Sequence, residues 1–156
     1  MIADVAVRLA RRSDAAAIAE LSRDEIEQGL PWGWRAGRIA GAITDAETNV
    51  VVVDSPAGTL AGFGIMVYRE RHAHLMLLAV HPSQRRRGVA SALLRWLEGV
   101  ARSAGIARVR LEARLDNGAA RCFYSEHGYR ERRLRPGMYR SDVHGVQLEK
   151  WLHAQE

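Results

Sequence analysis

Hydrophobic residues recur along the chain at two spacings, and each spacing predicts one kind of element. Alternating or short continuous apolar runs are typical of strands, and they cover residues 5–9, 50–53, 60–68, 74–80, 109–112, 129–134 and 146–152. Apolar residues three and four apart are typical of helices, and they cover residues 14–28, 34–43, 88–104 and 117–127. The order of these elements predicts a mixed α/β sheet in a single domain over residues 1–156.

Polar residues mark the starts of two helices, and one strand is unusually apolar. Ser13 or Asp14 offers an N-cap to the first helix, and Asp116 or Asn117 to the last one. The strand over 74–80 has a continuous apolar run, which predicts burial on both of its faces. With the helix and strand that follow, it forms a βαβ unit.

Composition restricts the class of protein. Of the 156 residues, 47% are hydrophobic and 26% are charged, as in an ordinary globular domain. The longest nearly apolar stretch, 75–80, is too short to span a bilayer, and the N-terminus lacks the apolar run of a secretory signal. The single cysteine, Cys122, cannot form an internal disulfide, and we expect it to be buried. We therefore expect a cytoplasmic protein without a membrane partner.

The charge is unevenly distributed along the chain. Residues 1–54 carry nine acids and six arginines, whereas residues 55–156 carry nine acids and seventeen bases, for a net charge of +5. A basic second part favours an anionic ligand there. Lys150 is the one lysine, a bias toward arginine that we attribute mostly to genome composition. The arginines within 130–135 are interpreted as a solvated strand face, so nucleic acid is not the favoured partner.

The most informative stretch joins the strand over 74–80 to the next helix. Three arginines, Arg85, Arg86 and Arg87, precede Gly88, at which the helix begins. The first turn of a helix has unpaired N–H groups and a partial positive charge, so it attracts anions. Gly88 and Ala90 are small and let an anion approach the backbone, which predicts a diphosphate site. Neither the P-loop sequence nor the dinucleotide fingerprint occurs here.

This stretch resembles a known motif. Arg85, Gly88 and Ala90 fill the fixed positions of the acetyl-CoA motif of the GNAT N-acetyltransferase superfamily. Residues 111–129 resemble the next strand and helix of that family, so the close resemblance covers roughly residues 75–130. It implies a mostly antiparallel sheet of about seven strands flanked by four helices. It also implies acetyl-CoA as co-substrate, no metal, and direct transfer of acetyl to a primary amine in a ternary complex.

The resemblance further implies which residues carry the reaction. Those that bind acetyl-CoA are Leu78, Ala79, Val80, Arg85, Arg86, Arg87, Gly88, Val89, Ala90, Ser91, Asn117 and Tyr124. Glu112 corresponds to the proton acceptor, acting through water, and Tyr124 to the proton donor for the CoA thiolate. On a strand Glu112 points away from its neighbours Leu111 and Ala113, so it can face a cleft. A salt-bridged surface glutamate and a half-buried packing tyrosine are the structural alternatives.

A finer resemblance concerns the acceptor. Pro31-Trp32, the Leu-Glu-x-Arg strand and the segment ending at Tyr139 look like the ribosomal-protein alanine N-acetyltransferases, which acetylate protein N-termini. Trp32, Trp34 and Tyr139 are therefore candidates for the substrate site, although the tryptophans could instead pin their loop to the core. A small amine such as an aminoglycoside, a polyamine or an amino acid stays open as acceptor. Acidic residues near the end of the first helix, Asp24, Glu25 and Glu27, would suit a cationic acceptor.

Other interpretations remain open from the residues alone. A non-catalytic acyl-CoA-binding module would need the anion site but neither Glu112 nor Tyr124. His72 and His74 share one strand face, but two such ligands without a third do not predict a metal site. The sequence also leaves open a homodimer.

Overall fold

The computed structural model describes residues 5–153, in which seven strands form one sheet in the order β1-β2-β3-β4-β5-β7-β6. The strands are β1 (Arg8–Leu9), β2 (Thr48–Asp54), β3 (Leu60–Tyr68), β4 (His72–Val80), β5 (Arg108–Arg114), β6 (Arg130–Arg140) and β7 (Val143–Trp151). The helices are α1 (Ala15–Glu25), α2 (Ala36–Thr44), α3 (Val89–Ser103) and α4 (Gly118–Glu126). Neighbouring strands are antiparallel except β4 and β5, which are parallel. The predicted fold class is confirmed.

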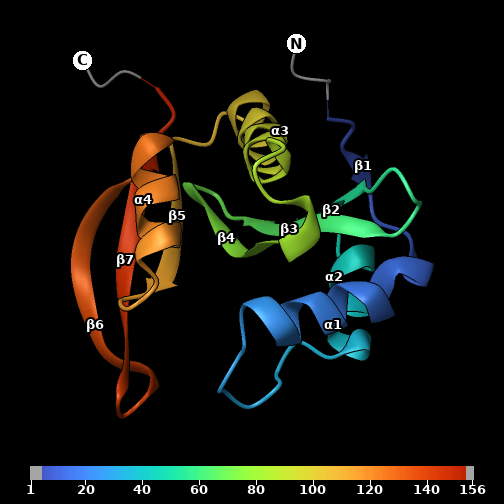
Figure 1. Cartoon of the computed structure of the whole chain (residues 1–156). Helices are drawn as coiled ribbons and strands as arrows, with labels where there is room; N and C mark the ends of the chain where they lie inside the picture. The colour runs from blue at the N-terminus through green and yellow to red at the C-terminus, as the bar shows by residue number, and fades with distance from the viewer. Residues whose placement is uncertain (1–4, 154–156) are drawn as a thin grey trace.

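Helices lie on both faces of the sheet. In Figure 1, α3 lies above the middle strands, α1 and α2 lie below them, and α4 lies beside β5 and β7. Two buried hydrophobic clusters correspond to these layers. Leu93 and Leu97 of α3 pack with Leu111 of β5 on one face, while Ile18 of α1 packs with Phe63 of β3 on the other. The apolar stripe of α3, spaced by four residues, is the pattern that predicted this helix.

The sheet opens between β4 and β5. Their pairing runs from His72 with Arg108 to Leu75 with Leu111 and ends there within the two described strands. Met76 stands at the adjacent irregularity, where the register between β3 and β4 shifts by one residue. The second half of β4 and the end of β5 therefore face an opening rather than each other.

Several boundaries differ from the prediction for local reasons. α1 ends at Glu25 and not near residue 28, because the N–H of Glu27 returns to the carbonyl of Ser22 at 2.9 Å. The last two strands are longer than predicted and reach the turn before Val143, where Arg140 still pairs with that residue. Long antiparallel pairing sustains β6 although its side chains are largely exposed.

Two predictions of burial are wrong. The strand over 74–80 is not buried on both faces, since Met76 is 37% exposed and the residues alternate between buried and partly exposed. The apolar side chains of its second face line the opening in the sheet instead. Cys122 is exposed, because it lies on the outer side of α4, away from buried Tyr124.

Candidate active site

The loop between β4 and α3 forms one wall of a cleft of about 640 Å³, within the range of ligand sites. We call it the β4–α3 cleft. Eleven of the twelve residues that the resemblance assigned to the cofactor line it: Leu78, Ala79, Val80, Arg85, Arg86, Gly88, Val89, Ala90, Ser91, Asn117 and Tyr124. The exception is Arg87, which does not belong to its lining.

The backbone of this loop is arranged for an anion. Arg86 and Gly88 both have left-handed conformations, with φ of 64° and 77°. Such residues turn successive N–H groups to one side, and here they lead directly into the unpaired N–H groups of the first turn of α3. Arg85 donates to Glu25 at 2.6 Å, so one of the three arginine charges is paired with α1. Arg86 lines the cleft, and it forms no ion pair with any of residues 5–153.

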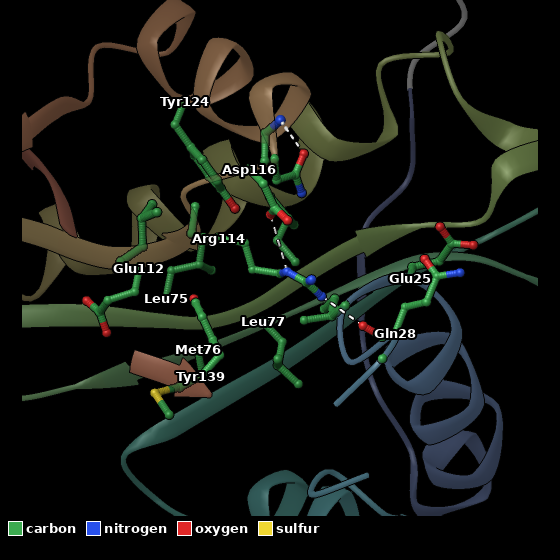
Figure 2. Close-up of a pocket in the computed structure, with 17 residues that line it drawn as sticks. Glu25, Gln28, Leu75, Met76, Leu77, Glu112, Arg114, Asp116, Tyr124 and Tyr139 are labelled. Atoms are coloured by element: carbon green, nitrogen blue, oxygen red, sulfur yellow. Dashed lines mark hydrogen bonds and ion pairs between the residues drawn. The ribbon is translucent and has the colours of Figure 1, made fainter. Parts of the chain in front are cut away.

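A second cleft, of about 520 Å³, occupies the opening between β4 and β5 (Figure 2). We call it the β4–β5 cleft. The residues that line both clefts are Glu25, Leu78, Asn117, Ala120 and Tyr124. The two clefts therefore meet in front of Tyr124, where a ligand in one can reach a ligand in the other.

Glu112 lies at the wall of the β4–β5 cleft and is paired with a histidine. The Nε2 atom of His74 is 2.9 Å from Oε1 of Glu112. The other carboxylate oxygen, Oε2, is buried and has no hydrogen-bond partner among the described residues. Burial raises the pKa of Glu112, but His74 and the charge of Arg135 lower it by more, so it lies below its usual value. Its neighbours Leu111 and Ala113 are buried in the core, as strand alternation predicted.

Tyr124 belongs to α4 and directs its hydroxyl end into the β4–β5 cleft (Figure 2). The side chain is 8% exposed and packs edge-on against Phe123 and Tyr129. Burial, with a smaller effect of Tyr139, raises the pKa of Tyr124 well above its usual value. Burial and the nearby Glu112 likewise raise the pKa of Tyr139 to about 12. Both phenols are therefore neutral proton donors at neutral pH.

One side of the β4–β5 cleft is tied together by arginines. Arg114 donates to the carbonyl of Gln28 at 2.8 Å and lies 3.4 Å from Asp116, so it spans the cleft in Figure 2. Arg140 of β6 donates to the carbonyl of Gly29 at 3.0 Å. These two contacts hold the loop after α1 against β5 and β6. Sequence reasoning missed them because the partners are far apart in the chain.

The candidate substrate residues separate into two groups. Tyr139 lines the β4–β5 cleft, but Trp32 and Trp34 line neither cleft. Trp32 donates from its ring nitrogen to the carbonyl of Ala19 at 3.2 Å, and the guanidinium of Arg38 lies over the ring of Trp34. Both tryptophans pack against the α1–α2 side of the core, so they pin the loop, as the structural alternative stated.

The acidic residues near the end of α1 also differ in role. Glu27 is 9% exposed, and its carboxylate accepts hydrogen bonds from the hydroxyl of Ser22 and the N–H groups of Gly33 and Trp34. Asp24 is paired with Arg23 on the same helix. Of these acids, Glu25 is the one that lines both clefts.

His74 is the residue that sequence reasoning undervalued. His74 is not among the predicted site residues, yet it contacts Glu112, the candidate base. The available signal was that His74 and Glu112 point to the same face of two strands expected to be neighbours in a βαβ unit. In residues 5–153 no three potential ligand side chains are grouped as a metal would require. In the same range no helix is long and apolar enough to cross a membrane.

The two joined clefts leave room for two ligands bound at the same time. Residues 13–129 match the acetyltransferase (GNAT) family. The chain therefore belongs to the acetyltransferase (GNAT) family.

Related sequences are named N-acetyltransferases. The ribosomal protein bS18 alanine N-acetyltransferase of Escherichia coli is 34% identical over 82 residues, which are 53% of this chain and 55% of that relative. The chain thus matches about half the length of this relative. An uncharacterised N-acetyltransferase of Methanocaldococcus jannaschii is 27% identical over 145 residues, which are 92% of this chain and 90% of the relative.

Solved structures share the fold at low identity. The crystal structure of the ribosomal-protein-S18-alanine N-acetyltransferase from Escherichia coli has a TM-score of 0.82 at 20% identity, covering 98% of this chain and 97% of that chain. An aminoglycoside 6'-N-acetyltransferase complexed with coenzyme A has a TM-score of 0.79 at 16% identity, covering 97% and 99% of the two chains. Enzymes for unlike acceptors thus share this architecture.

Proposed function

We propose that the protein transfers the acetyl group of acetyl-CoA directly to a primary amine in a ternary complex. The observation that carries this proposal is the meeting of the two clefts at Tyr124. An anion site lies at the far end of one cleft, and a buried carboxylate lies at the wall of the other. A donor and an acceptor bound at the same time would bring their reacting atoms to this junction.

Acetyl-CoA fits the β4–α3 cleft. Its diphosphate would accept hydrogen bonds from the first turn of α3, with the guanidinium of Arg86 beside it. The pantetheine would extend along residues 78–80 of β4, which have lost β5 as a neighbour. A backbone N–H of this strand can donate to the thioester carbonyl and stabilise the oxyanion that forms during attack. A fold relative complexed with coenzyme A supports the choice of cofactor.

Glu112 is the proposed base, and His74 positions it. The amine must lose a proton before it attacks the thioester carbonyl, and an N-terminal α-amine has a pKa of about 7.7–8.0. A carboxylate held ionised by His74 can take that proton, directly or through a water, at any pH near neutrality. The contact with His74 fixes the orientation of the Glu112 carboxylate at the wall of the β4–β5 cleft.

Tyr124 is the proposed acid. When the tetrahedral intermediate collapses, the carbon–sulfur bond breaks and the thiolate of CoA needs a proton. The hydroxyl of Tyr124 is neutral because its pKa is raised, and it stands where the clefts meet. It therefore donates the proton to the sulfur, and the tyrosinate is reprotonated, through solvent, by the second proton that the attacking nitrogen loses. The first proton, taken up by Glu112, is released to solvent.

The favoured acceptor is the α-amine of a protein N-terminus, in the cytoplasm. The names of the Escherichia coli relatives support this choice, as does the position of Tyr139 on the β6–β7 hairpin beside the cleft. A small cationic amine is the second candidate, because the carboxylate of Glu25 lines both clefts. Its ion pair with Arg85 weakens that case, since the carboxylate is already neutralised.

The test compares Tyr124→Phe with the unaltered protein. Peptides with free N-termini and small amines are offered with acetyl-CoA, and thiol release and the mass of the acceptor are measured. We expect a peptide acceptor, and we expect Tyr124→Phe to lower kcat by a factor of about 10²–10⁴, the usual worth of a general acid. Calorimetry should show unchanged acetyl-CoA binding for this variant.

A double variant serves as the control for the cofactor. Arg86→Ala/Gly88→Glu places a carboxylate where the diphosphate binds and should abolish acetyl-CoA binding. If the unaltered protein did not bind acetyl-CoA, the proposed function would be contradicted. Unchanged turnover in Tyr124→Phe would contradict the role of Tyr124 as the acid.

A further inference from the structure

One face of the sheet over β5, β7 and β6 is open to solvent. The alternate residues Val109 and Leu111 of β5 and Leu148 of β7 belong to the buried cluster that includes residues of α3 and α4, so their neighbours along the strands point the other way. On that other side α1 and α2 lie under β2 to β4 and stop short of β5 (Figure 1). No helix of the described residues covers this open side, so the side chains of β5, β7 and β6 form its surface.

Arginines dominate this open side. Strand register places them together, because residues directly opposite in a pair share a face. Arg130 and Arg110 are both opposite Glu149, Arg133 is opposite Gln147, and Arg135 is opposite Gly145. We define the arginine face as the set Arg108, Arg110, Arg130, Arg132, Arg133 and Arg135.

Three of these six arginines form ion pairs within the protein. Arg108, Arg110 and Arg132 all contact the buried carboxylate of Glu149, at 3.2–3.3 Å. The remaining three, Arg130, Arg133 and Arg135, form no ion pair within residues 5–153. They follow one edge strand, β6, over about 17 Å at the usual rise per residue of a strand. The face thus keeps a row of uncompensated positive charge.

The row runs past the candidate base. Glu112 of β5 is opposite Gln147 of β7, and Gln147 is opposite Arg133 of β6, so the row passes two strands away from the residue at the wall of the β4–β5 cleft. The side of that cleft toward α1 is bounded by the loop that Arg114 holds through Gln28 and Arg140 holds through Gly29. A long acceptor whose amine reaches Glu112 therefore has its open path over the arginine face.

These observations identify a substrate class within the proposed N-terminal acetylation, on which this inference rests. We propose that the acceptor is an acidic polypeptide, with aspartates or glutamates in the first several residues after its N-terminal residue, which bind the arginine face. Three free arginines spread over about 17 Å match a segment of about five extended residues. Opposite charges at this distance from the amine raise the association rate and the affinity of the acceptor.

Nucleic acid fits the same face less well. Proteins that bind single strands without sequence preference combine basic grooves with aromatic side chains on which successive bases stack. Among the described residues, Trp151 is the one large aromatic side chain exposed on this face. It lies at the end of the face away from Glu112, and the guanidinium of Arg108 already lies over its ring. A row of arginines without such a platform favours a polypeptide carboxylate ligand.

The experiment compares two decapeptides that begin with alanine and differ in whether the following residues are glutamate or glutamine. We expect kcat/KM to be about tenfold higher for the acidic peptide at low ionic strength, mostly through KM. The preference should shrink at high salt, because exposed charges are screened. In Arg130→Glu/Arg133→Glu the preference should disappear while the rate with the neutral peptide stays unchanged.

A matched control changes the same charge elsewhere. Arg12→Glu/Arg95→Glu alters two exposed arginines of the loop before α1 and of α3, and it should keep the preference for the acidic peptide. Equal kcat/KM for both peptides, or a preference that survives Arg130→Glu/Arg133→Glu, would overturn the inference.

Direct binding separates this inference from the proposed function. The fluorescence anisotropy of the labelled acidic peptide measures its binding to the arginine face even when no peptide is acetylated. Loss of this binding in Arg130→Glu/Arg133→Glu supports the inference. If acetyl-CoA binds but neither peptide is acetylated, the peptide acceptor of the proposed function is wrong. Tighter binding of a single-stranded RNA that competes with the acidic peptide would overturn the acidic polypeptide as ligand.

Discussion

At the scale of residues, the site depends on how neighbours tune a few ionisable groups. The side chain of Glu112 is largely buried, and burial alone would raise its pKa and favour the protonated form. The contact with His74 reverses this effect. Tyr124 has no such charged neighbour and keeps its proton because it is buried. Two groups with pKa values pushed in opposite directions from neutrality are the arrangement expected of a base and an acid.

We predict that His74→Ala shifts the acidic limb of the pH profile of kcat/KM to higher pH. Burial of Glu112 persists in this variant while its hydrogen bond is lost, so its pKa rises and protonation begins at a higher pH. His72→Ala is the matched control, since His72 lies on the same strand face and should leave the limb in place. An unshifted profile in His74→Ala would argue against Glu112 as the base.

The same contact has a consequence for stability. A carboxylate whose pKa is lowered on folding stabilises the protein above its unfolded pKa of about 4.3 and loses that contribution as the pH falls through the folded value. We therefore expect His74→Ala to lower the urea midpoint relative to the unaltered protein. This difference should be larger at neutral pH than at a pH below the usual pKa of a glutamate.

At the scale of elements, the loop before α3 depends on backbone conformation more than on side chains. Gly88 has a φ of 77°, which side-chain-bearing residues adopt at a cost of about 1–2 kcal/mol. A Cβ added there would meet no atom within 4 Å, so conformation and not space requires the glycine. Arg86 adopts a similarly strained conformation without being glycine, in the loop where we propose the anion site.

We predict that Gly88→Ala lowers the free energy of unfolding by about 1 kcal/mol and weakens acetyl-CoA binding. Gly99→Ala is the control within the same helix, because its Cβ also meets open space but its backbone is helical. That change should raise stability by up to about 1 kcal/mol and leave acetyl-CoA binding unchanged. Urea unfolding of both variants measures the change in stability, and calorimetry measures the change in acetyl-CoA binding. Equal effects of the two substitutions on acetyl-CoA binding would contradict the prediction.

At the scale of the whole molecule, the second half of the sheet is held together by buried carboxylates. Glu98 of α3 accepts from Lys150 of β7 and from the hydroxyl of Tyr129. Glu149 is 3% exposed and joins arginines of β5 and β6. These contacts fix β6, an edge strand with few buried side chains, against the rest of the sheet.

We predict that Glu149→Gln lowers the free energy of unfolding by about 2 kcal/mol. A buried ion pair that loses one partner costs about 3–5 kcal/mol, and we take a smaller value because the three arginines keep access to water. Glu47→Gln is the control, since that side chain is 69% exposed and 4.0 Å from Arg69, and its effect should stay within about 0.5 kcal/mol. Comparable urea midpoints for the two variants would contradict the prediction.

Local sequence patterns predicted the helices and strands, and one continuous segment predicted the proposed cofactor side of the site. Periodic apolar residues located all the helices and strands, and the length of the last two strands was underestimated because pairing, not burial, maintains them. The stretch from Arg85 to Ala90 could predict the proposed anion site because its signals are local: a glycine, small neighbours and the start of a helix. The orientation of Glu112 followed from the alternation of its strand.

Tertiary structure alone decided which distant residues meet. The contact of His74 with Glu112, the closure of the cleft by Arg114 and Arg140, and the gathering of arginines around Glu149 all join positions far apart in the chain. Such contacts depend on strand register and on where two strands part, which no local pattern encodes. The proposed acceptor side of the site depends on these contacts, whereas the proposed cofactor side depends mainly on one continuous segment.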